Sequence, residues 1–184
     1  VIVDYGLGNI VSAQQSFLKV IQDNFFDAEV IISSCPSDIY ASSHIVLPGQ
    51  GAFSSCIGGL KNIFGMIRAL EDSVLIKKKP FLGICVGMQL LAEIGHENGV
   101  TVGLNHLRGS QSIAQLSDCV IALERNQQAL DKVEANTTKL RVLKSRYTGD
   151  VGLATQLVYD RDTGRLSELA TTQDDLEFDK ELPF

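Results

Sequence analysis

Residues 80–89 read PFLGICVGMQ, and this stretch decides the fold expected for the first half of the chain. A short apolar run at 81–84 is followed directly by a helical pattern beginning at Val86. Glycines stand two positions before and two positions after Cys85, a spacing that lets a buried strand turn sharply into a helix. The stretch therefore predicts an elbow between a strand and a helix, with Cys85 pushed out at its tip.

The sequence on both sides of this elbow alternates short apolar runs with helical patterns. Strands are expected at 1–3, 28–32, 44–47 and 81–84, and helices at 10–21, 55–75 and 86–94. Strands of nearly continuous apolar character that alternate with helices are typical of a parallel sheet covered on both faces. The first half is therefore expected to be an α/β domain.

The pattern changes after Gly103. A short helix is expected at 110–117, followed by strands at 119–123, 140–147 and 154–159, while 126–138 is a polar connection without an assignment. Residues 171–184 carry five acidic residues against one lysine, which predicts a flexible acidic tail. We expect three parts, at 1–103, 104–170 and 171–184.

Composition excludes several classes of protein. The 184 residues are 45% hydrophobic and 21% charged, as in a globular protein, and the net charge of −6 gives no reason to expect non-specific binding of nucleic acid. No apolar run is long enough for a membrane span, and no signal peptide is expected. The four cysteines form no C-x-x-C pair, which disfavours a zinc site or a disulfide scaffold. A cytoplasmic protein with reduced thiols and no structural metal fits best.

Cys85 is the residue with the clearest chemical potential. At the tip of the elbow it would lie beside a helix N-terminus, whose amides and dipole favour a thiolate. Gly49, Gln50 and Gly51 follow the third expected strand and would place more backbone N–H groups nearby, as an oxyanion site requires. The alternative is that Cys85 is a small core residue and the glycines only permit close packing; the elbow alone leaves both interpretations open.

Three segments occur together and in order: DYGLGN at 4–9, LPGQGAF at 47–53 and the elbow at 80–89. This set resembles the class I glutamine amidotransferases, in particular the glutaminase subunits of imidazole glycerol phosphate synthase in histidine biosynthesis. The resemblance covers residues 1–103. It implies that Cys85 attacks the side-chain amide of L-glutamine without a cofactor, and that ammonia passes to a cyclase partner subunit. It also implies the remaining site residues, namely Gly49, Gln50 and Gly51 in the oxyanion loop and Gly83, Gly87 and Gln89 at the substrate.

The resemblance also implies a histidine base, oriented by a glutamate in a His-x-Glu motif. The chain has three histidines, His44, His96 and His106, and none has glutamate two residues later. Without a base, a thiolate still reacts with alkylating agents, but turnover falls by orders of magnitude. Impaired activity is therefore expected for this chain.

A second set of segments, at 107–110, 115–118, 121–126, 144–150 and 159–164, resembles the C-terminal end of RecA-like replicative DNA helicases of the phage primase-helicase group. It implies that Arg146, with Lys144 beside it, reaches the nucleotide of a neighbouring helicase subunit, and that Gln115 senses the γ-phosphate. Arg108 and Gly109 would face DNA. ATP and Mg are implied, yet no G-x-x-x-x-G-K-[ST] phosphate loop occurs. The alternative is that these charges are solvated side chains on exposed strands.

Together the two resemblances predict a chimera, with the start of one gene joined to the end of another between 103 and 107. Two functions remain open. One is residual glutamine amide chemistry at Cys85. The other is an inactive fusion. Its acidic tail either docks a replication polymerase, as the helicase resemblance implies, or is only a solvated flexible tail.

Overall fold

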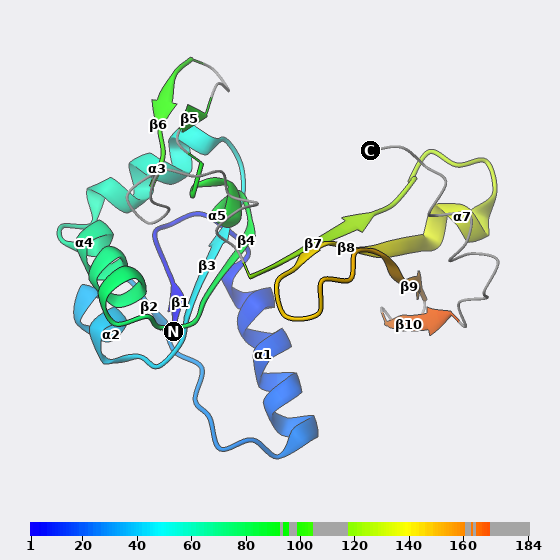
Figure 1. Cartoon of the computed structure of the whole chain (residues 1–184), viewed down its shortest axis with the longest axis horizontal. Coiled ribbons are helices and arrows are strands. Elements are labelled where there is room, and N and C mark those ends of the chain that lie inside the picture. The colour runs from blue at the N-terminus through cyan, green and yellow to red at the C-terminus, as the bar shows by residue number, and fades with distance from the viewer. Residues whose placement is uncertain (93, 96–98, 105–117, 161–162, 164, 170–184) are drawn as a thin grey trace. The chain divides into compact units, whose positions relative to one another are not determined.

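The chain folds as two compact units, Val1–Ile113 and Ala114–Phe184. The computed structural model describes residues 1–92, 94–95, 99–104, 118–160, 163 and 165–169. Figure 1 shows the first unit as a sheet with helices and the second as a sheet with one short helix. Each unit is described by itself.

The first unit is built on a parallel sheet of four strands in the order β2-β1-β3-β4. These strands are β1 (Ile2–Val3), β2 (Ile32–Ser33), β3 (Ile45–Gly49) and β4 (Phe81–Cys85). Every pairing between them is parallel, and every residue of β3 is buried. The predicted α/β fold with a parallel sheet is confirmed for this part of the chain.

Helices lie on both faces of the sheet (Figure 1). They are α1 (Ile10–Asn24), α2 (Pro36–Ala41), α3 (Phe53–Asn62), α4 (Met66–Glu71) and α5 (Val86–Gln89), with a π-helical turn, η1 (Asp72–Ile76), after α4. The apolar core joins one face of the sheet to α2, α3, α4 and α5, with Leu47, Leu60 and Leu70 fully buried in it. Helix α1 covers the other face and contains no buried residue.

The second strand is shorter than the sequence predicts. Residues 28–32 were expected to form it, whereas β2 comprises Ile32–Ser33. The register pairs Ile2 with Ile32, so residues 28–30 have no opposite residue in β1. The backbone of residues 28–30 is irregular in the structure.

The predicted helix at 55–75 is wrong in its continuity. It is divided into α3, α4 and η1, with the break at Gly65, whose φ of 82° lies in the left-handed region. Glycine adopts that conformation at little cost, and it ends or interrupts helices there. Five residues of η1 then complete the connection toward β4.

The predicted helix at 86–94 is also wrong in its length. Helix α5 ends at Gln89, and Ile94–Gly95 (β5) instead pairs with Thr101–Val102 (β6) in a short antiparallel hairpin. Leu104 then returns to α5 and donates a backbone hydrogen bond of 2.7 Å to the carbonyl of Leu90. Leu104 is buried in the core, so the return of the chain, and not a longer helix, completes the packing there.

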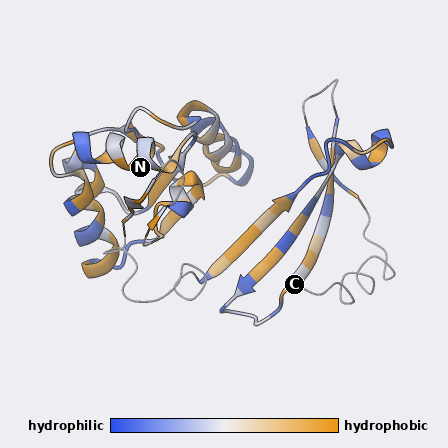
Figure 2. Cartoon of the chain, turned by 90° about the horizontal axis from the view of Figure 1, so that it is seen from above, coloured by the Kyte–Doolittle hydropathy of each residue, from blue (hydrophilic) through white to orange (hydrophobic). Residues whose placement is uncertain are grey.

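The second unit is an antiparallel sheet in the order β10-β9-β8-β7. The strands are β7 (Cys119–Glu124), β8 (Thr137–Ser145), β9 (Gly152–Tyr159) and β10 (Leu166–Leu169). The expected strands at 119–123, 140–147 and 154–159 correspond to β7, β8 and β9 with shifted ends, whereas β10 was not predicted. Figure 2 shows hydrophobic and hydrophilic residues mixed along these strands.

Helix α7 (Lys132–Asn136) lies in the segment that sequence left unassigned. Asp131 caps it by accepting hydrogen bonds from the N–H groups of Val133 and Glu134. In the sheet, Arg141 is buried, and its Nε lies 3.2 Å from an oxygen of Glu124. This ion pair joins β7 to β8.

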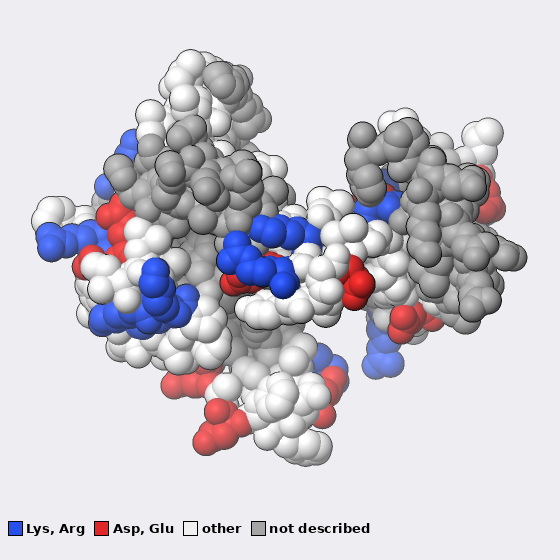
Figure 3. Space-filling model, in the orientation of Figure 1, with Lys and Arg blue, Asp and Glu red and all other residues white. Residues whose placement is uncertain are grey.

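Lysine and arginine side chains are interspersed with acidic ones on the face shown in Figure 3. Within the described part of the chain, no helix is long and apolar enough to span a membrane. The helix expected at 110–117 and the tail expected at 171–184 lie outside the described residues.

Candidate active site

Cys85 ends β4 and stands immediately before the first residue of α5. Its backbone has a φ of 54° and a ψ of −120°. In the described chain, Cys85 is one of three non-glycine residues with a positive φ. A side chain in such a conformation costs on the order of 1–3 kcal/mol and is often found at active sites. The thiol is exposed, which contradicts the interpretation of Cys85 as a core residue.

The two glycines of the elbow are required by close packing. A Cβ on Gly83 would lie 2.6 Å from the Cα of Met88, and a Cβ on Gly87 would overlap the carbonyl oxygen of Leu47. Any larger residue at these positions would push the helix away from the strand or from β3. The sequence assigned Gly83 and Gly87 to the substrate, a role that stays a prediction; in the structure they allow the turn that exposes Cys85.

The loop at 49–51 lies directly beside the elbow. Gly49 ends β3 in register with Cys85, and a Cβ on Gly49 would overlap the backbone nitrogen of Gly87. Gln50 and Gly51 are exposed, and Gly51 has a φ of 93°. Backbone amides of this loop and of the α5 N-terminus are therefore close to the thiol, as oxyanion stabilisation requires.

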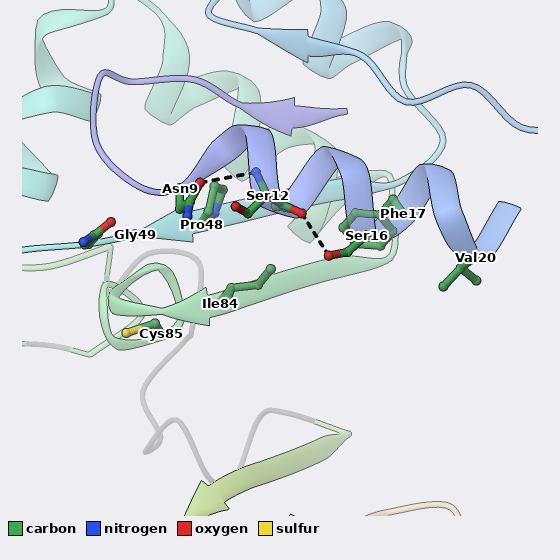
Figure 4. Close-up of a pocket in the computed structure, with 11 residues that line it drawn as sticks. Asn9, Ser12, Ser16, Phe17, Val20, Pro48, Gly49, Ile84 and Cys85 are labelled. Atoms are coloured by element: carbon green, nitrogen blue, oxygen red, sulfur yellow. Dashed lines mark hydrogen bonds between the residues drawn. The ribbon is translucent and has the colours of Figure 1, made fainter. Parts of the chain in front are cut away.

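A cavity of about 540 Å³ opens beside Cys85 on the α1 side of the sheet. Figure 4 shows α1 forming one wall, while Ile84 of β4 points toward it from the other side and Cys85 lies at the end of β4. The other lining residues are Asn9, Ser12, Ala13, Ser16, Phe17, Val20, Pro48, Gly49 and Gln50. The cavity thus joins the thiol, the loop and a helix face into one recess.

Helix α1 is positioned by its own N-cap. The side chain of Asn9 accepts a hydrogen bond of 3.2 Å from the N–H of Ser12, which satisfies one of the free amides at the start of the helix. Asn9, Ser12 and Ser16 recur at helical spacing, so their polar groups line one side of the recess. No direct role was predicted for the 4–9 segment. An asparagine directly before a helical pattern is an N-cap signal, and it could have placed Asn9 at the start of α1.

Below the loop, Tyr5 is buried and its hydroxyl donates a hydrogen bond of 2.6 Å to the carbonyl of Pro48. Burial is the main cause that raises the pKa of Tyr5 well above its usual range, and the adjacent Cys56 thiol adds to the effect. Tyr5 therefore stays protonated and acts as a permanent donor. Sequence reasoning assigned no role to Tyr5.

Gln89, the remaining substrate residue implied by the resemblance, is exposed at the last position of α5. Its carbonyl accepts a hydrogen bond of 2.8 Å from the N–H of Ala92. Gln89 does not line the recess. Its role at a substrate stays a prediction.

Among the described residues, His44 is the only histidine, and it immediately precedes β3. Its carbonyl accepts a hydrogen bond of 2.8 Å from the N-terminal amine of Val1. It lies five positions before Gly49, the residue paired with Cys85, which is roughly 16 Å along a strand. His44 is thus at the opposite end of the sheet from the thiol. His96 and His106 lie outside the described residues.

The helicase-like residues belong to the second unit. Lys144 pairs with Val120 near the end of β8, and the guanidinium of the exposed Arg146 lies 3.0 Å from a carboxylate oxygen of Asp118. Arg146 forms an ion pair with a residue of its own unit, as expected for a charged side chain at an exposed strand end. Arg108, Gly109 and Gln115 lie outside the described residues, and the role of the whole set stays a prediction.

Comparisons with known proteins agree with this geometry. The family described as Glutamine amidotransferase class-I matches residues 3–154, which extends beyond residue 103, where the resemblance was expected to end. The subunit HisH of imidazole glycerol phosphate synthase from Brucella suis biovar 1 (strain 1330) is 44% identical over 108 residues. The same subunit from Rhodospirillum rubrum is 41% identical over 109 residues.

These alignments cover 59% of this chain and 50% or 51% of the relatives. The chain therefore spans about half the length of the curated relatives it matches. The family match, by contrast, covers most of the chain and includes the elbow, the loop and the cap of α1. The chain belongs to the class-I glutamine amidotransferase family.

Proposed function

We propose that this chain carries the nucleophile half of a glutaminase that supplies ammonia for histidine biosynthesis. The observation that carries the proposal is the exposed Cys85 thiol, held at a positive φ beside the backbone of Gly49. An exposed thiol among oriented amides is suited to attack an amide carbonyl and to stabilise the oxyanion that forms. The HisH subunits above support histidine biosynthesis as the setting. A cytoplasmic location is part of the proposal.

In the proposed reaction, the Cys85 sulfur bonds to the side-chain carbonyl carbon of L-glutamine. The carbon–nitrogen bond then breaks, the nitrogen takes up a proton and leaves as ammonia, and a γ-glutamyl thioester remains on Cys85. Water cleaves the thioester to release glutamate and restore the thiol. No step requires a metal or an organic cofactor.

The proton transfers have no base in the described part of the site, because His44 lies at the far end of the sheet. We propose that water carries the protons in place of such a base. We therefore propose slow turnover, since positioned acid–base groups typically contribute 10²- to 10⁴-fold to such reactions.

The test measures glutamate release from L-glutamine by the full chain and by a Cys85→Ala variant. Cys35→Ala is the matched control, because Cys35 is also an exposed thiol but stands before α2. Slow release that is lost in Cys85→Ala and kept in Cys35→Ala is expected. Equal release by all three proteins would rule the proposal out.

The proposed partner is a cyclase subunit, because the relatives are named as subunits of a synthase. The measurement is sedimentation of the chain mixed with the cyclase subunit from Rhodospirillum rubrum. A complex that sediments faster than either protein supports this partner. Independent sedimentation at micromolar concentrations contradicts it.

A second candidate function is the helicase-like role of the second unit, supported by the position of Lys144 and Arg146 at one end of β8. These residues do not fit a magnesium–ATP site, since Arg146 pairs with Asp118 and the sequence contains no phosphate loop. No nucleotide step is therefore derived. If the acidic tail docks a replication polymerase or other helicase subunits, truncation at Thr171 must weaken that binding, and equal binding would exclude the tail. An inactive fusion would show neither glutamate release nor binding by the tail.

A further inference from the structure

We infer that Tyr5 and Cys56 are positioning residues for the loop at 49–51: their two buried donors hold the Pro48 and Gln50 carbonyls and so fix the path of the loop, and the direction of its free N–H groups, beside Cys85. The inference rests on the proposed glutamine chemistry and deepens it. Neither residue touches the recess. Both act through backbone carbonyls.

The first contact is made where the sheet leaves a carbonyl without a strand neighbour. Strand β1 pairs with β3 at Ile2 and Val46 and ends at Val3, so Pro48 lies beyond the paired register. The Tyr5 hydroxyl donates to the Pro48 carbonyl at 2.6 Å and takes the place of a strand neighbour. A peptide C=O and the following N–H point in opposite directions, so the Gly49 N–H is turned toward β4, where the parallel ladder directs it at the carbonyl of Ile84 and ties the start of the loop to the elbow.

The second contact repeats this arrangement two residues later. The Cys56 thiol, fully buried in α3, lies 3.5 Å from the carbonyl oxygen of Gln50 and donates to it. By the same peptide geometry the N–H of Gly51 points away from α3. The positive φ of Gly51 belongs to the same turn. The two donors therefore orient two alternate peptides of the loop.

The donors are themselves held in place by close packing. A Cβ on Gly59 would lie 2.7 Å from the Tyr5 carbonyl oxygen and 2.9 Å from the Tyr5 ring. A Cβ on Gly49 would lie 3.0 Å from the Tyr5 hydroxyl. Cys56 and Gly59 are three residues apart on α3, so they share a face and both contact the tyrosine. Tyr5 is confined between α3 and the loop.

This arrangement distinguishes two classes of reagent at Cys85. Iodoacetamide alkylates a thiolate without needing the loop amides, so its rate depends on access and on thiolate content. The glutamine analogue 6-diazo-5-oxo-L-norleucine places a ketone oxygen where an oxyanion would lie. The sulfur bonds to its diazo carbon, dinitrogen leaves, and the thiol proton ends on that carbon. Its rate should depend on the direction of the loop N–H groups.

The experiment measures both alkylation rates at Cys85, by peptide mass spectrometry, in the full chain. Tyr5→Phe removes the hydroxyl and keeps the ring, and Cys56→Ala removes the thiol. Tyr40→Phe is the matched control, because its hydroxyl donates to Asp72 at 2.9 Å on another part of the unit. Cys56→Ser keeps a donor and tests for rescue.

We expect Tyr5→Phe and Cys56→Ala to slow the diazo reagent at least tenfold and to leave the iodoacetamide rate within twofold. Tyr40→Phe should change neither rate, and Cys56→Ser should recover most of the loss. If Tyr5 and Cys56 had only a structural role, their variants would react more slowly with both reagents. That result would overturn the inference, and so would unchanged rates with both reagents.

A separate measurement keeps the inference testable if the proposed function fails. Failure of the function would appear as a wild-type Cys85 that the diazo reagent labels no faster than Cys35. The ¹H–¹⁵N cross peaks of Gly49 and Gly51 would then decide. Shifts in Tyr5→Phe and Cys56→Ala, absent in Tyr40→Phe, support positioning of the loop. Unmoved cross peaks would overturn it.

Discussion

Gly87 packs against Leu47 so closely that a Cβ on residue 87 would overlap the Leu47 carbonyl oxygen. Gly87→Ala must therefore separate α5 from β3, and we expect it to lower the free energy of unfolding by about 2–4 kcal/mol. Gly58→Ala is the control, because Gly58 lies inside α3 with nothing within 4 Å of its Cβ position. That change should raise stability by about 0.5–1 kcal/mol. Urea unfolding followed by circular dichroism measures both, and equal stability of Gly87→Ala and wild type would contradict the packing.

The accessibility of the thiols gives a second prediction. Cys35, Cys85 and Cys119 are exposed, whereas Cys56 is buried. Iodoacetamide should therefore add to three cysteines of the native chain and to the fourth only in urea. Intact-mass spectrometry counts the adducts, and peptide mapping identifies the protected thiol. Rapid labelling of Cys56 in the native chain would mean that α3 does not cover it.

The pKa of Tyr5 gives a prediction about pH. Burial raises that pKa in the folded chain, so above pH ~10 the unfolded chain loses the tyrosine proton while the folded chain keeps it. Stability must then fall as the pH rises above about 10. Thermal unfolding at pH 9, 10 and 11 should show this fall in wild type and a smaller one in Tyr5→Phe. Identical slopes in the two proteins would show that Tyr5 does not carry the effect.

The second unit offers a comparison of two ion pairs. Arg141 is buried and Glu124 is half-exposed, whereas both partners of the Arg146–Asp118 pair are exposed. We expect Glu124→Ala to destabilise the sheet by about 1–2 kcal/mol and Asp118→Ala by no more than about 1 kcal/mol. Amide hydrogen exchange in β8 reports on this sheet directly. A larger effect of Asp118→Ala would reverse the expected order.

The sequence predicted the parallel sheet and the elbow because both depend on local patterns. A run of apolar residues followed by glycines around Cys85 is a property of about ten consecutive positions. The lengths of β2 and α5 depend on contacts that are distant in sequence. Residues 28–30 lack an opposite residue in β1, and α5 stops where Leu104 returns to bond with Leu90.

The sequence likewise predicted only part of the candidate site. Cys85 and the 49–51 loop were found because glycine marks tight backbone geometry. Tyr5 and Cys56 were not found, because a tyrosine after a short strand and a cysteine on an apolar helix face are ordinary core residues in sequence. Their importance lies in which carbonyl each one reaches. For Tyr5 this follows from the register of β1 against β3, and for Cys56 from the position of α3 beside the loop.

The contact of Gly49 and Gly87 has a consequence for the entropy of the reacting group. Because backbone meets backbone there, no side-chain rotation can loosen the elbow. With its φ and ψ fixed, Cys85 keeps a single free dihedral, χ1, which has three staggered positions. The sulfur atom is therefore restricted to three positions relative to the backbone. Most of the ordering of the sulfur is completed when the chain folds, before any molecule binds in the recess.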